Sequence, residues 1–266
     1  MVSAWRRWAR ELARLVVPVA CAGCGLPDVP CCARCAALLD GAPRRVEAGA
    51  PRLDRLDGVA PLPVWALVAY AGPVRDLVVA WKDRGRVDLD RLLAAGMRRA
   101  AAAVAPGVAA AAPGGVLVVP APSSAAARRA RGREHVRVLA RAVARGLSDA
   151  GVPAAVAPVL RRRGGARDQV GLGSRARGRN LAAAVAVRRR ALLRAGGRGP
   201  AVCLLVDDVL TTGATLAAAE RALETAGAAV VGALVAAATP PPGTRSSRDA
   251  TDLAATVYRP GGVGLA

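Results

Sequence analysis

Phenylalanine is absent from this chain of 266 residues, and histidine and lysine each occur once, as His135 and Lys82. Aromatic residues make up only 2% of the chain, which weakens any nucleic-acid surface that depends on stacking bases against aromatic rings. No run of about 20 uninterrupted apolar residues occurs, so we expect no transmembrane helix.

Acidic residues are also scarce: 19 stand against 39 lysines and arginines, for a net charge of +20. So basic a chain implies polyanionic partners, either nucleic acid or highly phosphorylated small molecules. Apolar residues make up 53% of the chain, which excludes global disorder. The length suits one substantial domain with a small appendage.

The first twenty residues superficially resemble an export signal, because an apolar stretch at 12–20 follows a basic start. The stretch is short, Arg14 interrupts it and Pro18 is badly placed for cleavage, so we interpret the segment as a short amphipathic helix. Contact with a membrane surface is the alternative to packing on the protein's own domain. The predicted apolar face consists of Trp5, Trp8, Leu12 and Leu15.

Five of the six cysteines cluster near the N-terminus, and four of them form two Cys-x2-Cys pairs, Cys21 with Cys24 and Cys32 with Cys35. Each pair can place two thiolates on one side of a tetrahedral zinc ion. Cys31 could replace its neighbour, although the spacing favours Cys32. A disulfide or a redox pair is the alternative, but nothing indicates an oxidising compartment, and we expect a cytoplasmic protein. Four thiolates leave no open position, so the zinc would be structural.

Alternating apolar strands and amphipathic helices run through the remainder and predict an α/β fold with a parallel sheet. An Ala/Gly/Pro-rich stretch, 100–115, predicts a helix end and a loose surface loop. Residues 161–180 predict a basic loop entering a short helix, and the chain after Thr239 a poorly ordered tail. The expected strands are 59–70, 116–119, 154–160, 184–187, 202–206 and 229–236, and the expected helices 72–82, 89–104, 134–149 and one ending near 226.

The segment Val202–Leu216 is the most informative part of the chain. Its apolar residues 202–206 predict a strand buried on both faces, and Asp207 and Asp208 follow at the carboxyl end, where ligands bind in open α/β sheets. The Thr/Gly-rich loop behind them opens a helix, whose N-terminus attracts anions. Carboxylates beside a phosphate-binding loop suit a sugar phosphate; an ordinary buried strand, turn and helix is the alternative.

This segment resembles the signature of the type I phosphoribosyltransferases, which bind 5-phosphoribosyl-1-pyrophosphate (PRPP) there. The resemblance implies that Asp207 and Asp208 hold the ribose 2′- and 3′-hydroxyls. It also implies that the 5′-phosphate is wrapped by Thr211, Thr212, Gly213, Ala214 and Thr215.

Further motifs, in order along residues 15–238, resemble the ComF/GntX family, which joins a zinc-binding segment to this fold. The matching positions are Pro18, Tyr70-x-Gly72, Lys82-x-x-Gly85-Arg86, Pro120-Ala121-Pro122, Arg131-Gly132 and the block Gln169, Arg175, Arg179 and Asn180. The implied architecture is a Rossmann-like parallel sheet of the type I phosphoribosyltransferase fold with a zinc-ribbon-like N-terminal segment. The expected domains are 1–40, 41–238 and a flexible tail, 239–266.

The resemblance implies displacement of pyrophosphate from PRPP by a nitrogen nucleophile, with Mg²⁺ on the pyrophosphate. Backbone N–H groups of the loop Ala121, Pro122, Ser123 and Ser124 would face the pyrophosphate. Residues Arg131, Gln169, Arg175, Arg179 and Asn180 would form a flexible loop able to close over it. The sequence does not reveal the acceptor. The part of the protein that covers the acceptor, called the hood in this family, would come from residues 36–70 and the zinc segment.

A second function is a binding module that senses PRPP or binds single-stranded DNA or other nucleic acid in DNA uptake, with competence-machinery proteins as partners, because the family name refers to competence. Where the family often has Arg-Gly-Phe-Asn-Gln, this chain has Arg131-Gly132-Arg133-Glu134-His135, without the aromatic residue. We interpret His135 as a basic loop residue at a helix start, since PRPP chemistry needs no histidine. For Lys82, a simple helix cap is the alternative to a role in the site.

Overall fold

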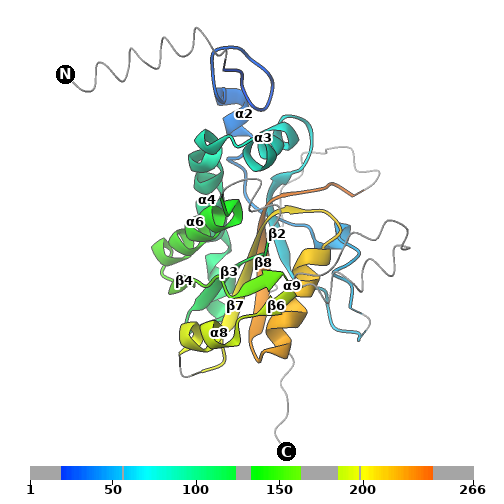
Figure 1. The fold of residues 1–266 in the computed structure, drawn as a ribbon, viewed down its shortest axis with the longest axis vertical. Helices are drawn as coiled ribbons and strands as arrows, with labels where there is room; N and C mark the ends of the chain where they lie inside the picture. The colour runs from blue at the N-terminus through cyan, green and yellow to red at the C-terminus, as the bar shows by residue number, and fades with distance from the viewer. Residues whose placement is uncertain (1–18, 56, 124–132, 163–184, 198, 242–266) are drawn as a thin grey trace, which may run out of the picture.

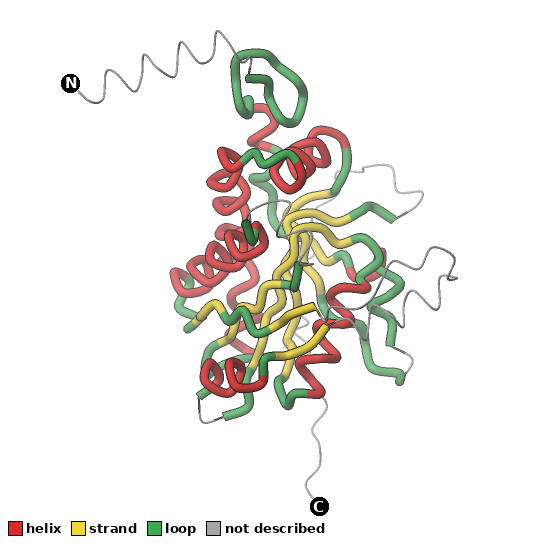
Figure 2. The backbone as a smooth tube through the Cα atoms, in the orientation of Figure 1, coloured by secondary structure: helices red, strands yellow, loops and turns green. Residues whose placement is uncertain are grey.

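The fold was analysed in a computed structural model, which describes residues 19–55, 57–123, 133–162, 185–197 and 199–241. A six-stranded sheet forms the centre, with helices on both faces (Figures 1 and 2). The strand order is β1-β2-β8-β7-β3-β4, and all neighbours are parallel except β1 and β2. The predicted α/β fold is therefore confirmed.

The elements of the main sheet are spread along the whole described chain. Its strands are β1 (Arg44–Arg45), β2 (Val64–Ala69), β3 (Val116–Pro120), β4 (Ala154–Val156), β7 (Val202–Leu210) and β8 (Ala229–Ala238). A separate antiparallel pair consists of β5 (Leu160–Arg162) and β6 (Val185–Val187). The helices are α2 (Ala33–Ala37), α3 (Gly72–Asp83), α4 (Asp90–Ala111), α6 (His135–Asp149), α8 (Arg189–Gly196) and α9 (Ala214–Thr225), with short 3₁₀ turns at Glu47–Gly49 and Val87–Leu89.

Alternate residues of β7 contribute to the two larger hydrophobic clusters of the described residues. Leu204 and Val206 pack with residues of α3, α4 and α6 on one face, which we call the α6 face. Cys203 and Leu205 pack with residues of α8 and α9 on the other, the α9 face. Side chains of a strand point alternately to opposite faces, so this central strand has to be apolar throughout.

Helix α4 is longer than the sequence predicted, because it continues through Pro106 to Ala111. The expected helix end near Val104 is therefore wrong, and only the last residues of 100–115 lie outside the helix. Proline removes one helical hydrogen bond, but Val104, Ala105 and Val108 are buried against the rest of the core, and this burial outweighs the loss. Helices α4 and α6 cross closely, since a Cβ on Gly146 would lie 2.2 Å from the Arg98 carbonyl oxygen.

The single strand expected at 154–160 is also wrong, because it divides into β4 and β5. Pro158 lies between them and has no N–H to donate to a sheet. The strand expected at 184–187 is present as β6, but it pairs with β5 outside the main sheet. No helix among the described residues is long and apolar enough to cross a membrane. The predicted helix at 5–15 lies outside the described residues.

Candidate functional site

Strand β3 ends beside β7 near the carboxyl edge of the sheet, next to the two acids of β7. Pro120, the last residue of β3, pairs with Val206 of β7, and the Ala121 N–H donates to the Val206 carbonyl at 2.8 Å. The loop at 121–123 therefore leaves the sheet beside Asp207. A small cavity of about 90 Å³ lies against this loop, lined also by Arg137 and Arg188.

The two acids lie on opposite faces of β7, because the strand continues past them to Leu210 instead of ending at residue 206. Asp207 pairs in register with Val235, which belongs to the core of the α9 face. Asp208 points to the α6 face, where it contacts Lys82 and His135. The sequence placed both acids at one end of a strand but did not separate their directions.

Asp208 is enclosed by donors. Its Oδ2 lies 2.7 Å from Lys82 Nζ and 2.6 Å from His135 Nε2, and its Oδ1 accepts the Val209 N–H at 2.7 Å. Burial alone would raise the pKa of Asp208, but the His135 hydrogen bond and the positive charge of Lys82 lower it to about 2. Asp208 is therefore an anion that is neutralised inside the protein.

His135 lies at a helix start, as the sequence suggested, but it is a buried residue and not a basic loop residue. It is the first residue of α6, it is 1% exposed, and its ring packs edge-on against Trp81 at 5.1 Å. Lys82 likewise does more than end a helix, since it binds Asp208. Sequence reasoning missed both residues as partners of Asp208; their signal was that each is the chain's only residue of its kind.

Asp207 is in a different electrostatic position. Its Oδ1 accepts the Asp208 N–H at 2.8 Å. Burial, and next the negative charge of Asp208, raise the pKa of Asp207 to about 8. Of the two neighbouring acids, Asp208 is therefore the one that ionises more readily, and Asp207 holds its proton more tightly.

The predicted phosphate loop follows β7 and leads into α9. Gly213 has φ +81° and precedes the first helical residue, Ala214. The first turn of a helix has N–H groups without helical partners, which suits an anion. Thr211 and Thr212 are exposed beside them, and Thr212 Oγ1 accepts the Ala214 N–H at 3.5 Å. The tight turn and helix start that the sequence predicted are both present.

Residues 50–53, which were expected to contribute to an acceptor hood, support the phosphate loop. The Arg52 N–H donates to the Thr212 carbonyl at 2.9 Å. Gly213 packs so tightly on this segment that a Cβ there would lie 2.6 Å from Leu53 Cγ and 3.2 Å from Ala50 Cβ. Glycine is required here both by the positive φ and by the close approach.

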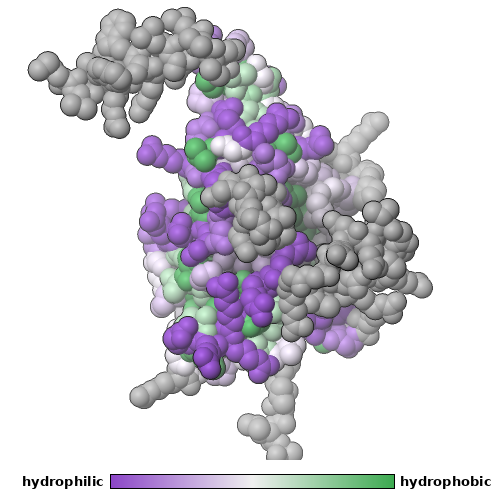
Figure 3. Space-filling view, in the orientation of Figure 1, coloured by the Kyte–Doolittle hydropathy of each residue, from purple (hydrophilic) through white to green (hydrophobic). Residues whose placement is uncertain are grey.

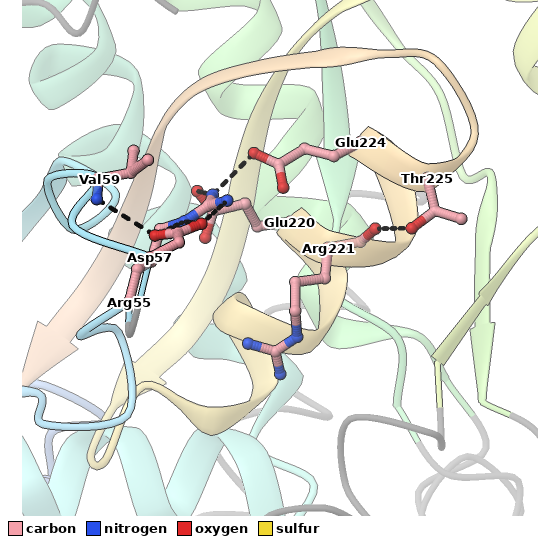
Figure 4. A network of polar contacts seen from close by, with 7 residues as sticks. All are labelled: Arg55, Asp57, Val59, Glu220, Arg221, Glu224 and Thr225. Carbon is pink, nitrogen blue, oxygen red and sulfur yellow. Dashed lines mark hydrogen bonds and ion pairs between the residues drawn. The ribbon is translucent and has the colours of Figure 1, made fainter.

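A polar network attaches the same segment to α9 (Figure 4). The Arg55 guanidinium contacts Asp57 at 2.9 Å, Glu224 at 2.9 Å and Glu220 at 3.4 Å. Burial, and next the charge of Glu224, raise the pKa of Glu220 to about 7. Arg55 thus joins the loop that supports Gly213 to the helix that Gly213 precedes.

The four cysteines of the two Cys-x2-Cys pairs converge, with all four Sγ atoms within 4.8 Å of one another. Cys24 and Cys32 Sγ are 3.7 Å apart, close to the spacing of about 3.8 Å that follows from Zn–S bonds of about 2.3 Å in a tetrahedron. Burial opposes ionisation of Cys21, but the N–H groups of Cys32, Cys24 and Gly23 lower its pKa to about 6. The cluster therefore fits a zinc ion.

Cys31 is not one of these four cysteines, and its Sγ lies 3.7 Å from the Cys32 carbonyl oxygen. The geometry thus favours Cys32, as the spacing did. The cysteine segment packs on the main core: Cys21 and Cys35 belong to the α6-face cluster, and Arg86 donates to the carbonyls of Ala20 and Pro30 at 3.3 and 2.9 Å.

Part of the predicted site lies outside the described residues. This holds for Ser124 of the pyrophosphate loop and for the flexible-loop residues Arg131, Gln169, Arg175, Arg179 and Asn180. Their segments begin and end at described elements near the site: 124–132 connects the loop after β3 to α6, and 163–184 connects β5 to β6.

Comparison with known proteins agrees with the α/β fold. Residues 137–264 match the model of the phosphoribosyl transferase domain. The matched range includes Asp207, Asp208 and the loop Thr211–Thr215, and it begins just after His135. No curated protein matches the chain. Residues 137–264 are therefore similar to a phosphoribosyl transferase domain, and a four-cysteine cluster that could bind zinc precedes them.

Proposed function

We propose that the protein binds PRPP with Mg²⁺ at the carboxyl edge of β3 and β7 and transfers its phosphoribosyl group to a nitrogen acceptor, releasing pyrophosphate. The observation that carries this proposal is the meeting of two loops at one edge: 121–123 lies beside Asp207, and Thr211–Thr215 opens α9. A sugar carrying phosphate at one end and pyrophosphate at the other needs such a pair of loops. The phosphoribosyl transferase domain supports the substrate class.

In this reaction the bond from C1 of the ribose to the pyrophosphate oxygen breaks, and a bond from C1 to nitrogen forms. The transition state places positive charge on the ring and negative charge on the leaving group, so catalysis consists of positioning and charge neutralisation. The N-terminus of α9 would hold the 5′-phosphate and N–H groups of the β3 loop the pyrophosphate. Arg137 and Arg188, beside that loop, supply positive charge nearby.

Magnesium would enter as part of the substrate, where it neutralises charge on the pyrophosphate. Oxygen ligands of the kind that Mg²⁺ prefers are present at this edge, in the Ser123 hydroxyl and in the Asp207 carboxyl once the metal has displaced its proton. The chain's own residues would bind and orient the sugar. A four-cysteine cluster joined to this domain is also the arrangement implied by the resemblance to ComF/GntX.

Calorimetry with PRPP and Mg²⁺ tests the proposal, followed by a screen of amines for pyrophosphate release. We expect binding by the native protein and at least tenfold weaker binding by Asp207→Asn. Asp149→Asn is the matched control, because it alters an acid in an exposed pair with Arg98. Absence of PRPP binding by the native protein would overturn the proposal. Binding without pyrophosphate release from any amine would favour a PRPP sensor.

For the cysteine cluster we propose one structural zinc ion, held by Cys21, Cys24, Cys32 and Cys35. Metal analysis should find one zinc per chain, lost in the Cys21→Ser/Cys24→Ser double variant. Cys31→Ser should retain it, because Cys31 is not one of these four cysteines. Equal zinc content in the native protein and the double variant would refute this assignment.

A second candidate function, nucleic-acid binding, is favoured by one surface. Hydrophilic side chains gather over α8 and the neighbouring β5–β6 pair (Figure 3). The exposed arginines there are Arg161, Arg162, Arg188, Arg189, Arg190 and Arg194. Within the described part of the chain none of them pairs with a carboxylate. An uncompensated arginine surface beside the β3 loop suits the backbone of a single strand.

Fluorescence anisotropy with a single-stranded oligonucleotide, measured against salt concentration, tests this function. The Arg189→Glu/Arg190→Glu variant should bind more weakly and with a shallower salt dependence, because each lost phosphate contact lowers the slope by about 0.7. Arg34→Glu/Arg44→Glu changes the net charge equally at two exposed arginines elsewhere. Equal effects of the two variants would leave only non-specific charge attraction and would reject the surface.

A further inference from the structure

Three side chains from separate elements meet beneath the carboxyl edge of the sheet: Lys82 from α3, His135 from α6 and Asp208 from β7. The lysine and the histidine both contact the same oxygen, Oδ2, at 2.7 and 2.6 Å, while Oδ1 accepts a backbone N–H. Asp208 and His135 are 4% and 1% exposed. Both carboxylate oxygens are thus engaged within the protein.

His135 depends on this contact. In the described part of the chain its Nδ1 is buried without a hydrogen-bond partner. If Asp208 turned toward a ligand, a buried imidazole would lose its partner at Nε2 as well, and an unsatisfied buried polar group is costly. Asp208 is therefore held in place by the residue that it satisfies.

The surroundings of His135 are themselves fixed by polar contacts. The ring packs against Trp81, whose Nε1 donates to Asp90 at 2.6 Å. Arg133 lies 5.5 Å from the Trp81 ring centroid and donates to the Trp81 carbonyl at 3.0 Å. This support leaves little freedom for the imidazole to follow Asp208 if the carboxylate moved.

We propose that His135 and Lys82 are positioning residues that hold Asp208 as an internal anchor, so that of the two neighbouring acids only Asp207 contacts the ribose hydroxyls. The proposal rests on the proposed function for its ligand. It changes the expectation that both acids hold the sugar. Asp207 is the acid left for this role, because its register partner Val235 belongs to the core of the α9 face, on the same side as the helix behind the phosphate loop.

The single histidine and single lysine make the anchor directly observable. In protein purified without a histidine tag and labelled with ¹⁵N-histidine and ¹³C-lysine, each residue type gives one set of NMR signals. We expect a histidine Hε2 signal protected by its hydrogen bond. Asp208→Asn should shift both the His135 and the Lys82 signals, and Asp149→Asn should shift neither. Unchanged signals in Asp208→Asn would overturn the anchor.

Addition of PRPP and Mg²⁺ then separates the two roles for the acids. If Asp208 stays anchored, the Hε2 signal persists in the complex. Its loss, together with a lysine shift like that of Asp208→Asn, would show Asp208 turning to the sugar and would overturn the proposal. If Asp208→Asn does not fold, Lys82→Gln is the second variant, and it should shift the histidine signal because it removes the charge beside Oδ2.

Calorimetry with PRPP and with ribose 5-phosphate completes the test. Asp207→Asn should weaken the binding of both ligands at least tenfold. His135→Leu should weaken PRPP binding severalfold in the native background. In a protein that already carries Asp208→Asn, the same change should weaken PRPP binding no further. His135→Gln keeps a hydrogen-bond donor, so its affinity for PRPP should stay within threefold of the native value. If the losses of PRPP affinity from His135→Leu and Asp208→Asn were additive in the double variant, the positioning role of His135 would be overturned. If the native protein binds neither ligand, the proposed function and the ribose role of Asp207 fail, whereas the anchor is still judged by the ligand-free spectra.

Discussion

The two faces of β7 at its carboxyl edge differ in how they treat charge. On the α6 face, Asp208 is buried and matched by Lys82 and His135. On the α9 face, the pKa values of Asp207 and Glu220 are raised, in both cases first by burial, so both acids favour the neutral form. On the α6 face, the carboxylate charge is therefore balanced by neighbouring side chains. On the α9 face, the environment disfavours ionisation of the acids.

This difference shows how two adjacent, identical residues can have different roles. A strand turns consecutive side chains to opposite faces, so Asp207 and Asp208 meet different neighbours although one peptide bond separates them. The α6 face supplies donors from two helices, whereas the α9 face carries the phosphate loop. Substitutions that act on one face only can separate the two roles.

The largest effect is expected at Asp208. Replacing one partner of a buried ion pair leaves the others without compensation, so Asp208→Ala should lower the free energy of unfolding by about 3–5 kcal/mol. Asp207→Ala should leave it unchanged or raise it at pH 7, because an acid that ionises with difficulty is removed. Urea unfolding at pH 7 measures both. Equal losses would mean that the two faces do not differ.

The next effect is expected at Gly213 on the α9 face. Gly213→Ala adds a Cβ 2.6 Å from Leu53 Cγ at a φ of +81°, so strain and overpacking together should cost about 3 kcal/mol of unfolding free energy. It should also abolish PRPP binding in calorimetry, because the phosphate loop moves.

Gly227, just beyond the other end of α9, is the matched control for this substitution. It has a φ of +84°, and a Cβ added there would meet no atom within 4 Å. Gly227→Ala should therefore cost about 1 kcal/mol, from the backbone alone, and leave PRPP binding intact. Equal costs at the two glycines would show that contact with Leu53 contributes nothing.

A smaller, pH-dependent effect is expected at Glu220. Its pKa is raised from 4.5 to about 7, so between these values the unfolded chain releases a proton that the folded protein keeps. The free energy of unfolding therefore falls as pH rises through this window. Glu220→Gln removes this fall. The free energy of unfolding of the variant should therefore exceed that of the native protein by about 1–3 kcal/mol at pH 7 but not at pH 4.

Denaturant unfolding from pH 4 to pH 8 measures this difference. Glu224→Gln is the control, because it removes an Arg55 partner at the surface and keeps the buried carboxyl of Glu220. It should retain most of the native slope. Parallel curves for the native protein and Glu220→Gln would contradict the assignment.

The smallest effect is expected for the exposed pair of Arg98 and Asp149, whose side chains are 57% and 51% exposed at 2.7 Å. Solvent screens such a pair, so Arg98→Ala should change the free energy of unfolding by less than about 1 kcal/mol. A loss as large as that of Asp208→Ala would show that the contribution of an ion pair to the free energy of unfolding does not depend on its burial.

The parts that the sequence predicted well depend on short-range spacing. Cys21-x2-Cys24 and Cys32-x2-Cys35 indicated one cluster, and their four sulfurs converge. The apolar run before Asp207 indicated a strand buried on both faces, and β7 contributes side chains to both hydrophobic cores. Such patterns are visible because the residues that cooperate lie within a few positions of one another.

The parts that it missed depend on distant contacts. Helix α4 continues through Pro106 because its far end is buried by other elements, and the strand at 154–160 divides because β5 finds its partner in β6. His135 is 73 positions from Asp208, so no local pattern could join them. Burial by remote segments decided each of these cases.

The sequence by itself determined the α/β fold class, the cysteine cluster and the segment Val202–Leu216, because local periodicity and spacing specify them. Only the tertiary structure decided that Asp208 faces α3 and α6 while Asp207 faces the α9 side, and that His135 and Lys82 hold Asp208. The physical reason is that the charge state and direction of a buried acid depend on its neighbours in space, and these come from elements far apart in the chain.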